Sequence, residues 1–453
     1  MPSQHDQDRV DLAASTRPRR LLFAVVVAIA SALGGGTVGA LVAFRLAPAA
    51  SVVSSTPETF GSTSAVRPSF VAAATRVTIR VPEDVPGIAE AVSSIADWRI
   101  SAGAFVDIRV APGRYAISAP LVFAHPDGRR IGISAASAAP ALHFVKVDSI
   151  NRLANGSMTV IMRLKSTTSL SIDDWIRVTA TEGSGSHEAF RGLFRIVGLE
   201  GEQVRLAYGS YSPTLADAQL TSAMIFKPAV QLVFTPTDTM TDYFAFDILT
   251  ALGNISNVAI LAATPTSRAS GLRHGDGATL VTGTGGGDGG LSIGGWGRHC
   301  MWAFRNAQAT VDGITVSGCR SGGIYASQGA QVEAVRGLAS GTGIGFAAVD
   351  GGQITCSRCV ATRSTTGFLA VAGGRVIAAN ARAVGGMEAS TGYRAWPGGF
   401  IWAEGAVATY NGSGFAAEGG TLWIAGATAS HNKVAFSDPP QPSLLQPGRQ
   451  LPP

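Results

Sequence analysis

The segment TGFLAVAGGRVIAANARAVGG, residues 366–386, has near copies before and after it in the chain. IGFAAVDGGQITCSRCVATRS fills residues 344–364, and SGFAAEGGTLWIAGATASHNK fills residues 413–433. Across these copies and their neighbours an aromatic residue returns every 21 to 25 residues, as Phe304, Tyr325, Phe346, Phe368, Tyr393, Phe415 and Phe436. A fixed period of this length is typical of a solenoid, in which each repeat forms one coil.

Two further columns keep the same period. An aliphatic residue follows each aromatic by seven or eight positions, as Val311, Val332, Ile354, Val376, Ile401 and Leu422. A small or polar residue precedes each aromatic by four positions, as Cys300, Ser321, Thr342, Ser364, Ala389, Asn411 and Asn432. The intervening residues are short β-branched segments and Gly, Asn and Ser turns, without helical periodicity. We therefore predict an all-β chain that forms a right-handed parallel β-helix.

Each coil of this β-helix is expected to contain three short strands and three turns. The aromatic and aliphatic columns would lie inside, and the polar column would hydrogen-bond from coil to coil at a corner. Gly would supply the turn conformations that other residues avoid.

The start of the repeat region has a pattern of its own. Residues 85–123, VPGIAEAVSSIADWRISAGAFVDIRVAPGRYAISAPLVF, place apolar residues at helical spacing before a strand, a Pro-Gly turn and a second strand. The helical positions are Ile88, Ala91, Val92, Ile95 and Trp98. Over residues 76–145 and 229–437 the strand and turn pattern resembles the pectate-lyase-like β-helix superfamily. The resemblance implies a helix that caps the open end of the solenoid, and it identifies a fold rather than an activity.

Two segments depart from the repeat. Residues 146–228 have longer strands, longer turns and more charges, and they predict a small β-barrel or β-sandwich inserted between coils, as some tailspike-like proteins carry. Residues 438–453 are rich in Pro and predict a disordered tail.

The N-terminus predicts export. Residues 1–20 carry several Arg and precede an apolar segment, residues 21–46, whose uncharged run is long enough to cross a bilayer as a helix. The arginines favour a cytoplasmic N-terminus, so the rest of the chain would lie in the periplasm or at the cell surface. A cleaved signal is the alternative, because Ala47-Pro48-Ala49 has the form of a cleavage site, and it would give a secreted protein. Residues 47–75 predict a flexible linker.

Charge argues against nucleic acid as a partner. The formal net charge is +5 over 453 residues, and charged residues make up 14% of the chain. This excess is small for a nucleic-acid-binding protein, whereas it is compatible with an acidic polysaccharide.

Known chemistries of the superfamily leave no trace in the sequence. The resemblance would imply Asp clusters that bind calcium, paired Asp with Gly-His-Gly, or Asp-Pro-His, and none of these strings is present. The densest polar stretch is residues 271–300. Within it we consider as catalytic residues His274, Asp276, Asp288 and His299, because a carboxylate or imidazole is the usual acid or base. Arg273 and Arg298 could hold a uronate carboxylate. A solvated loop between coils is the alternative.

The string GTGGGDGG, residues 283–290, resembles one copy of a calcium-binding nonapeptide. A single imperfect copy does not establish a calcium site, and no other cofactor is indicated.

Two residue pairs are further candidates for substrate binding. Asp312 and Glu333 each follow the aliphatic column by one residue, which predicts neighbouring outward carboxylates. Trp402 and Trp423 share that phase and, with Trp396 and Tyr393 nearby, could form a sugar-stacking platform. A solvated sheet face is the alternative for the acids, and a cover over the C-terminal end of the solenoid is the alternative for the tryptophans.

The four cysteines are Cys300, Cys319, Cys356 and Cys359. We expect buried free thiols within the coils, although disulfides are open to an exported protein. The spacing fits neither a thioredoxin motif nor a zinc site well.

Together these patterns predict a membrane-anchored, extracytoplasmic β-helix that binds or scaffolds a surface polysaccharide. The alternatives are a polysaccharide lyase, glycoside hydrolase or epimerase acting on an acidic glycan, and a phage-derived or secreted adhesin. An oligomer is compatible with all of them.

Overall fold

The computed structural model describes residues 70–154, 157–184, 187–210, 219–236, 242–282, 290–385, 389–437 and 444–445. The apolar segment of residues 21–46, most of the linker, Asp288 and nearly all of the tail lie outside these residues. No helix among the described residues is long and apolar enough to cross a membrane.

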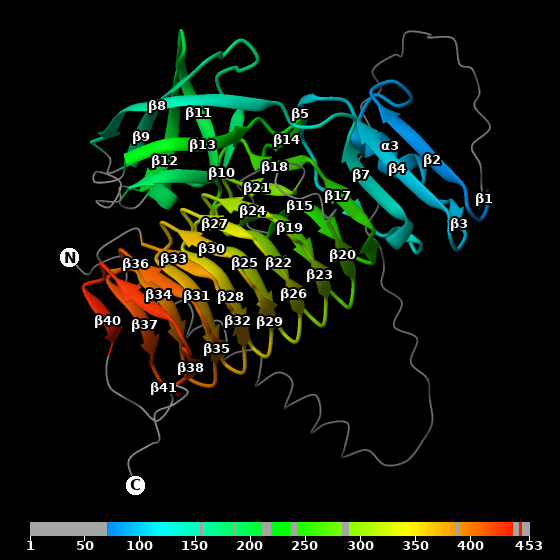
Figure 1. Ribbon diagram of the computed structural model, residues 1–453. Helices are drawn as coiled ribbons and strands as arrows, with labels where there is room; N and C mark the ends of the chain where they lie inside the picture. The colour runs from blue at the N-terminus through cyan, green and yellow to red at the C-terminus, as the bar shows by residue number, and fades with distance from the viewer. Residues whose placement is uncertain are drawn as a thin grey trace, which may run out of the picture. The chain divides into compact units, whose positions relative to one another are not determined.

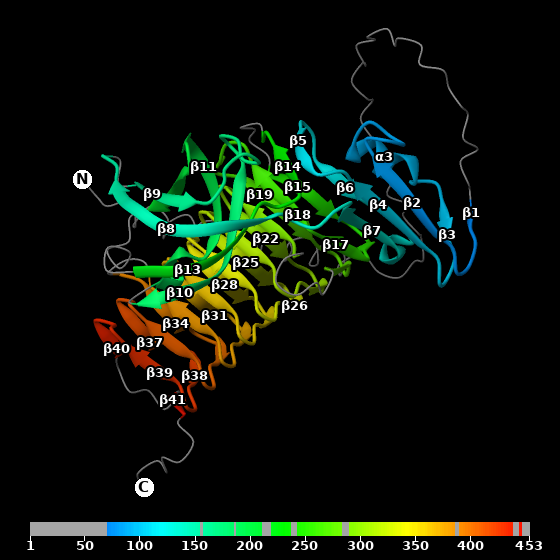
Figure 2. The same ribbon diagram turned by 45° about the horizontal axis from the view of Figure 1, so that its top comes forward.

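The predicted parallel β-helix is confirmed (Figure 1). Strands from successive coils pair in parallel and form three long sheets, and Figure 2 shows the strands of successive coils side by side. Sheet I contains β5 (Gly113–Ile117), β14 (Val230–Phe234), β18 (Val258–Ala262), β21 (Ser292–Gly294), β24 (Thr315–Ser317), β27 (Leu338–Ser340), β30 (Val360–Thr362), β33 (Arg382–Val384), β36 (Val407–Thr409) and β39 (Thr428–Ser430).

Sheet II follows sheet I along each coil. It contains β6 (Leu121–Phe123), β15 (Tyr243–Ile248), β19 (Ala269–His274), β22 (His299–Ala303), β25 (Gly322–Ser327), β28 (Ile344–Val349), β31 (Thr366–Val371), β34 (Thr391–Ala395), β37 (Ser413–Ala417) and β40 (Val434–Ser437). Sheet III completes the coil with β16 (Ala251–Leu252), β20 (Thr279–Val281), β23 (Gln308–Thr310), β26 (Gln331–Glu333), β29 (Gln353–Thr355), β32 (Arg375–Ile377), β35 (Phe400–Trp402), β38 (Thr421–Trp423) and β41 (Leu444–Leu445).

The aromatic column is real but begins later than its spacing predicts. Phe346, Phe368, Tyr393 and Phe415 stack inside the solenoid, with ring centroids 4.7 to 5.1 Å apart. On the preceding coils the inward places belong to Ile324 and Met301. Tyr325 therefore lies on the outer face, and Phe304 lies in the turn after β22. The spacing alone does not show whether an aromatic residue points inward or outward, because the two kinds of position are only one or two residues apart in the sequence.

The same shift affects the aliphatic column. Val332, Ile354, Val376, Ile401 and Leu422 pair in register along sheet III, as predicted. Their partner on the preceding coil is Ala309, so the prediction for Val311 is wrong, because Val311 lies in the turn that follows β23.

Glycine precedes the inward aromatics because the coils approach closely there. A Cβ at Gly367 would lie 2.5 Å from the carbonyl oxygen of Gly392 and 3.0 Å from Cβ of Ala383. Gly345 meets the carbonyl oxygen of Gly367 in the same way. These glycines are in strands and do not have positive φ. Close packing, rather than a turn conformation, therefore requires them.

The polar column forms hydrogen bonds between coils at the corner between sheets I and II. The hydroxyls of Thr342 and Ser364 are 3.0 Å apart, and the Asn411 N–H donates to Asn432 Oδ1 at 2.8 Å. Between them the place is taken by Ser390, which donates to Asn411 Oδ1 at 3.5 Å, rather than by Ala389. Side chains as well as backbone groups therefore form the hydrogen bonds between coils at this corner.

The N-terminal coils have a fourth, short sheet of β2 (Arg76–Val81), β4 (Phe105–Val110), β7 (Ile131–Ala135) and β17 (Asn254–Ser256), beside the short pair β1 (Phe70–Val71) and β3 (Arg99–Ile100). The helix α3 (Ile88–Ser94) packs against β2 and β4, and a 3-10 turn η1 (Gly128–Arg130) precedes β7. Ile88, Ala91, Ile95 and Trp98 are buried in the main core, and Val92 packs against it.

Between β7 and β14 the chain forms a closed six-stranded barrel with its own core. Its elements are β8 (Ala141–Arg152), β9 (Ser157–Leu164), β10 (Trp175–Ser184), the 3-10 turn η2 (His187–Phe190), β11 (Gly192–Glu200), β12 (Gln203–Ser210) and β13 (Gln219–Phe226). The barrel packs on the outer face of sheet I. The Leu193 N–H donates to Ser317 Oγ at 2.9 Å, and Ser340 Oγ donates to the Arg191 carbonyl at 2.7 Å.

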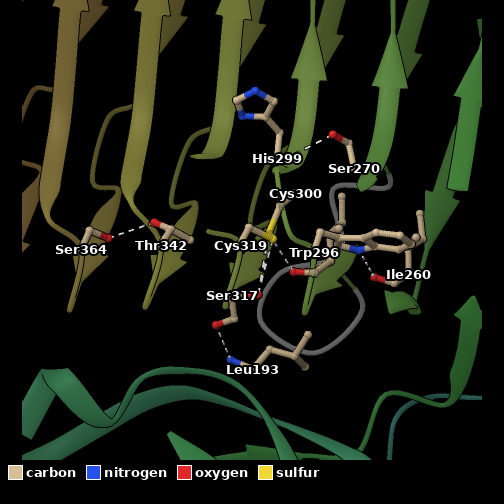
Figure 3. Close-up of a disulfide and its surroundings, with 11 residues drawn as sticks. Leu193, Ile260, Ser270, Trp296, His299, Cys300, Ser317, Cys319, Thr342 and Ser364 are labelled. Atoms are coloured by element: carbon tan, nitrogen blue, oxygen red, sulfur yellow. Dashed lines mark hydrogen bonds between the residues drawn. A yellow bond between two sulfur atoms is a disulfide. The ribbon is translucent and has the colours of Figure 1, made fainter. Parts of the chain in front are cut away.

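The cysteines correct another expectation, because they form disulfides rather than free thiols. Cys300 pairs with Cys319, and Cys356 pairs with Cys359. The first bond joins two successive coils. Figure 3 shows it beside Ser317, whose hydroxyl accepts the hydrogen bond from the barrel residue Leu193. The cross-link therefore fixes the coils on which the barrel rests.

We predict that Gly367→Ala destabilises the protein by about 1–3 kcal/mol, as overpacking of a tight interior usually does. The matched control is Gly198→Ala in the barrel, where the added Cβ would meet its nearest neighbour at 3.4 Å and the backbone is unstrained. Thermal unfolding of both variants checks this. Equal melting temperatures would show that the coils have room at Gly367.

Candidate functional site

Sheet II carries an unusual column on its outer face. The register places Asp247, Arg273, Trp302 and Tyr325 side by side on four successive coils. Their neighbours in sequence, such as Leu272, point inward because successive residues of a strand alternate between faces. From β28 onward the same column holds Ala347, Leu369, Arg394 and Ala416. An unbroken run of charged and aromatic residues in this column therefore occurs on the coils of β15–β25, whereas Arg394 on β34 has Leu369 and Ala416 as its column neighbours.

Three partly exposed rings meet on these coils. The ring centroids of Phe244 and Trp302 are 5.9 Å apart, and those of Trp302 and Phe304 are 5.1 Å apart. The rings are tilted by 42° and 33° rather than stacked face to face. Such tilted contacts are a favourable geometry for aromatic pairs, and each of the three side chains is partly exposed.

An arginine lies over each ring. The guanidinium carbon of Arg273 is 4.1 Å from the centroid of Phe244, that of Arg298 is 5.0 Å from Trp302, and that of Arg305 is 5.4 Å from Phe304. These are cation–π distances. We call the three rings and the three arginines the aromatic–arginine patch.

Each arginine of the patch also has a carboxylate partner. Arg273 binds both oxygens of the buried Asp247, with Nε donating to Oδ1 at 2.7 Å and Nη2 donating to Oδ2. Arg298 Nη1 is 3.0 Å from Asp242 Oδ2. Arg305 Nη1 is 3.1 Å from Asp276 Oδ1.

The charges of the patch therefore balance. A guanidinium has five N–H donors and a carboxylate occupies at most two of them, so donors remain beside the rings. Each carboxylate oxygen can accept more than one hydrogen bond, so acceptor positions remain as well. Apolar ring surface bordered by donors and acceptors suits a ligand that has apolar faces and many hydroxyls.

His299 lies behind the patch. Its side chain is 7% exposed, and its ring centroid is 4.6 Å from that of Tyr325 and 5.8 Å from that of Trp302. Figure 3 shows it pointing away from the disulfide that begins at the next residue. Burial, and then the charge of Arg298, lower the pKa of His299 to about 3. His299 is therefore neutral at physiological pH and supports the rings rather than transferring protons.

His274 is inside the solenoid. It shares an inward column with Ile248 and Ala303 and is 0% exposed. Burial lowers its pKa to about 4, and the nearby backbone of Ala278 opposes that shift, although neither ring nitrogen has a hydrogen-bond partner in the described chain. A side chain sealed in the core cannot exchange protons with a ligand on the surface, so the catalytic assignment of His274 does not hold.

The predicted carboxylates do not assemble into a catalytic pair. Asp276 is exposed and bound to Arg305, and Asp288 lies outside the described residues. The register of sheet III pairs Glu333 with Thr310, so Asp312 and Glu333 are not directly opposite each other and the predicted carboxylate pair is wrong. Asp312 instead lies in a turn, where its Oδ1 accepts a hydrogen bond from the Val335 N–H at 3.2 Å.

Trp402 and Trp423 do project from neighbouring coils of sheet III, with centroids 5.3 Å apart. They stack face to face at 23°, however, and the register continues the column to Ile377 on one side and Leu445 on the other. The ring faces of this stack therefore point along the column, and the sugar-stacking role of the pair stays a prediction. Tyr393 is buried in the core, and Trp396 lies at the surface beneath Arg394.

The segment considered for calcium, residues 283–290, lies almost entirely outside the described residues. Elsewhere in the described chain no group of three or more His, Cys, Asp or Glu side chains is placed to hold a metal ion.

The structure thus brings together Arg273, Arg298 and His299 of the predicted residues and adds Phe244, Trp302 and Phe304. The added rings had one signal in the sequence. Trp302 and Phe304 flank the inward Ala303 at the end of one strand, as two outward aromatics would.

No family model matches the chain, and no curated protein matches it. Among solved structures, a protein described as a glycoside hydrolase is 7% identical, with 82% of this chain and 96% of that chain covered at a TM-score of 0.30. The Gp54 tailspike of Acinetobacter baumannii bacteriophage AP22, in complex with A. baumannii capsular saccharide, is 9% identical. The match covers 75% of this chain and 71% of that chain at a TM-score of 0.19.

We predict that the protein loses stability as the pH falls from about 6.5 towards about 4. The pKa values of His274 and His299 are lowered to about 4 and about 3, so the unfolded chain takes up these protons first. The contribution of the two histidines to the free energy of unfolding is fully present above pH ~6.5, and each unit by which a pKa is lowered represents about 1.4 kcal/mol. His274→Leu should flatten the pH dependence of the melting temperature, whereas His143→Leu on the exposed barrel surface should leave it unchanged. An unchanged slope in His274→Leu would contradict this account.

Proposed function

We propose that this protein binds a polysaccharide on the aromatic–arginine patch and does not turn it over. The observation that carries the proposal is the contact of three partly exposed rings with three arginines on one outer face of the solenoid. A pyranose has apolar C–H faces and polar edges. The rings would meet the faces, and the Arg–Asp pairs around them would meet the hydroxyls.

Binding is favoured over turnover because the patch lacks a group ready to transfer a proton. An effective acid or base has a pKa near the working pH. His299 is far below that range, and burial raises the pKa of Tyr325 to about 12, far above it. Asp247, Asp242 and Asp276 are each held by an arginine.

Export is part of the proposal. Two disulfides are typical of proteins in oxidising compartments, and the apolar segment of residues 21–46 offers a signal or anchor. A surface polysaccharide would be accessible there.

We predict that Trp302→Leu weakens glycan binding by about thirtyfold, since removal of a binding hot spot typically costs ~2 kcal/mol. Leu keeps an apolar cover over His299, which limits the loss of stability. The measurement is retention of the full-length chain, in mild detergent, on an array of bacterial and plant polysaccharides.

Trp396→Leu is the matched control. Trp396 is 36% exposed, Arg394 lies 4.7 Å from its ring centroid, and its Nε1 donates to Glu418 at 2.8 Å. Like Trp302, it has an arginine over its ring and a hydrogen-bonded Nε1, but it lies outside the patch. Equal retention of both variants, or binding by neither variant nor the parent chain, would refute the proposal. Release of shortened glycan products would replace binding by an enzymatic function.

A further inference from the structure

The turn between sheets III and I carries an excess of positive charge. Arg336 and Arg358 occupy equivalent places in this turn on successive coils, and the Arg336 N–H donates to the carbonyl of Ser357 at 2.9 Å. Arg382 begins sheet I on the coil after that, and its N–H donates to the carbonyl of Cys359 at 2.8 Å. Successive coils are separated by one strand spacing, about 4.8 Å. The three side chains are exposed.

Few carboxylates compensate these charges. Neither Arg336 nor Arg358 has a salt-bridge partner among the described residues. Arg382 Nε is 3.1 Å from Glu188 Oε2 of the barrel, and Glu188 Oε1 is also 3.9 Å from Arg191 Nη1. One carboxylate is thus shared by two guanidinium groups.

Arg191 shows that this environment is crowded with positive charge. Burial lowers its pKa, Glu188 opposes that shift, and Arg382 lowers the pKa further. Its Nε is buried without a hydrogen-bond partner in the described chain. We call Arg191, Arg336, Arg358 and Arg382 the arginine corner.

The two turn arginines are also unfavourable for the fold itself. Both have left-handed backbone conformations, with φ of 60° at Arg336 and 59° at Arg358. At the same place in other coils the chain has Gly313, Asn380, Gly405 and Gly426, which adopt positive φ more readily. Like charges on adjacent strands also repel. Residues that break local rules without a structural gain point to function.

We propose that the arginine corner binds an anionic polymer through carboxylate or phosphate groups on successive repeating units. The inference rests on the proposed polysaccharide-binding function and adds the charge of the ligand. The aromatic–arginine patch is neutral and cannot select for charge. The corner has four guanidinium groups, whereas Glu188 pairs with two of them and Asp312 lies in the turn of the coil before Arg336. Guanidinium groups hold both kinds of anion through paired hydrogen bonds.

The test uses the full-length chain and three soluble probes: polygalacturonate, inorganic polyphosphate and dextran. The double variant Arg336→Asn, Arg358→Asn should bind the polyanions at least about tenfold more weakly, as loss of charged hydrogen bonds implies. Its melting temperature should be equal to or higher than that of the parent, because Asn tolerates positive φ and the repulsion is removed. Polygalacturonate and polyphosphate distinguish a carboxylate source from a phosphate source.

The control double variant Arg99→Gln, Arg114→Gln removes the same charge from exposed positions on the N-terminal coils and should bind normally. Equal losses in both double variants would mean nonspecific attraction and would overturn the proposal, as would unchanged binding in the corner variant. A lower melting temperature of the corner variant would make the arginines structural. If Trp302-dependent glycan binding persists while the parent binds no polyanion, the proposed function stands and this inference fails.

Discussion

The spacing between parallel strands governs this molecule. Each coil must fit the coils above and below it at a spacing of about 4.8 Å, so the residue at each position of the repeat packs against the residues at the same position on the neighbouring coils. Large flat rings meet this requirement by stacking, as Phe346, Phe368, Tyr393 and Phe415 do. The residue before each of those four rings must be Gly, because a side chain would collide with a carbonyl oxygen of the next coil.

The same constraint leaves the outer faces free to vary. Inside, a change on one coil disturbs its neighbours, whereas outside the side chains extend into solvent or towards another element. The barrel uses the outer face of sheet I, and its contacts with Ser317 and Ser340 depend on small polar residues there. Sheet II and the turn between sheets III and I are where the outer columns change character, to aromatic and to cationic. We locate binding at these two places because neither change improves the packing of the coils.

The sequence predicted the interior better than the exterior. The period and the residue columns identified the β-helix, because every coil must place residues of similar size and polarity at the same inward positions. The predicted aromatic column was wrong on its first two coils. Phe304 and Tyr325 have the spacing of column members, but Phe304 lies in a turn and Tyr325 points outward. That error misplaced Val311 and created the Asp312–Glu333 pair.

Site residues were partly predictable for a related reason. Polar density singled out residues 271–300, and Arg273, Arg298 and His299 do gather at the patch. Whether a histidine points inward depends on register, which is why His274 was misassigned. The pairing of each arginine with a carboxylate is a contact between coils, 26 residues apart for Arg273 and Asp247, and no local pattern reveals it. The disulfide Cys300–Cys319 was missed for the same reason.

The most direct measurement is hydroxyl-radical footprinting of the full-length chain with and without a polysaccharide that it retains. Oxidation of aromatic side chains reports their exposure residue by residue, without a mutation that alters packing. If the outer face of sheet II binds the glycan, Phe244, Trp302 and Phe304 become protected, while Trp396 and Trp402 are oxidised as before. Protection of Trp396 or Trp402 with unchanged oxidation of Trp302 would contradict the account and place the binding surface on the C-terminal coils.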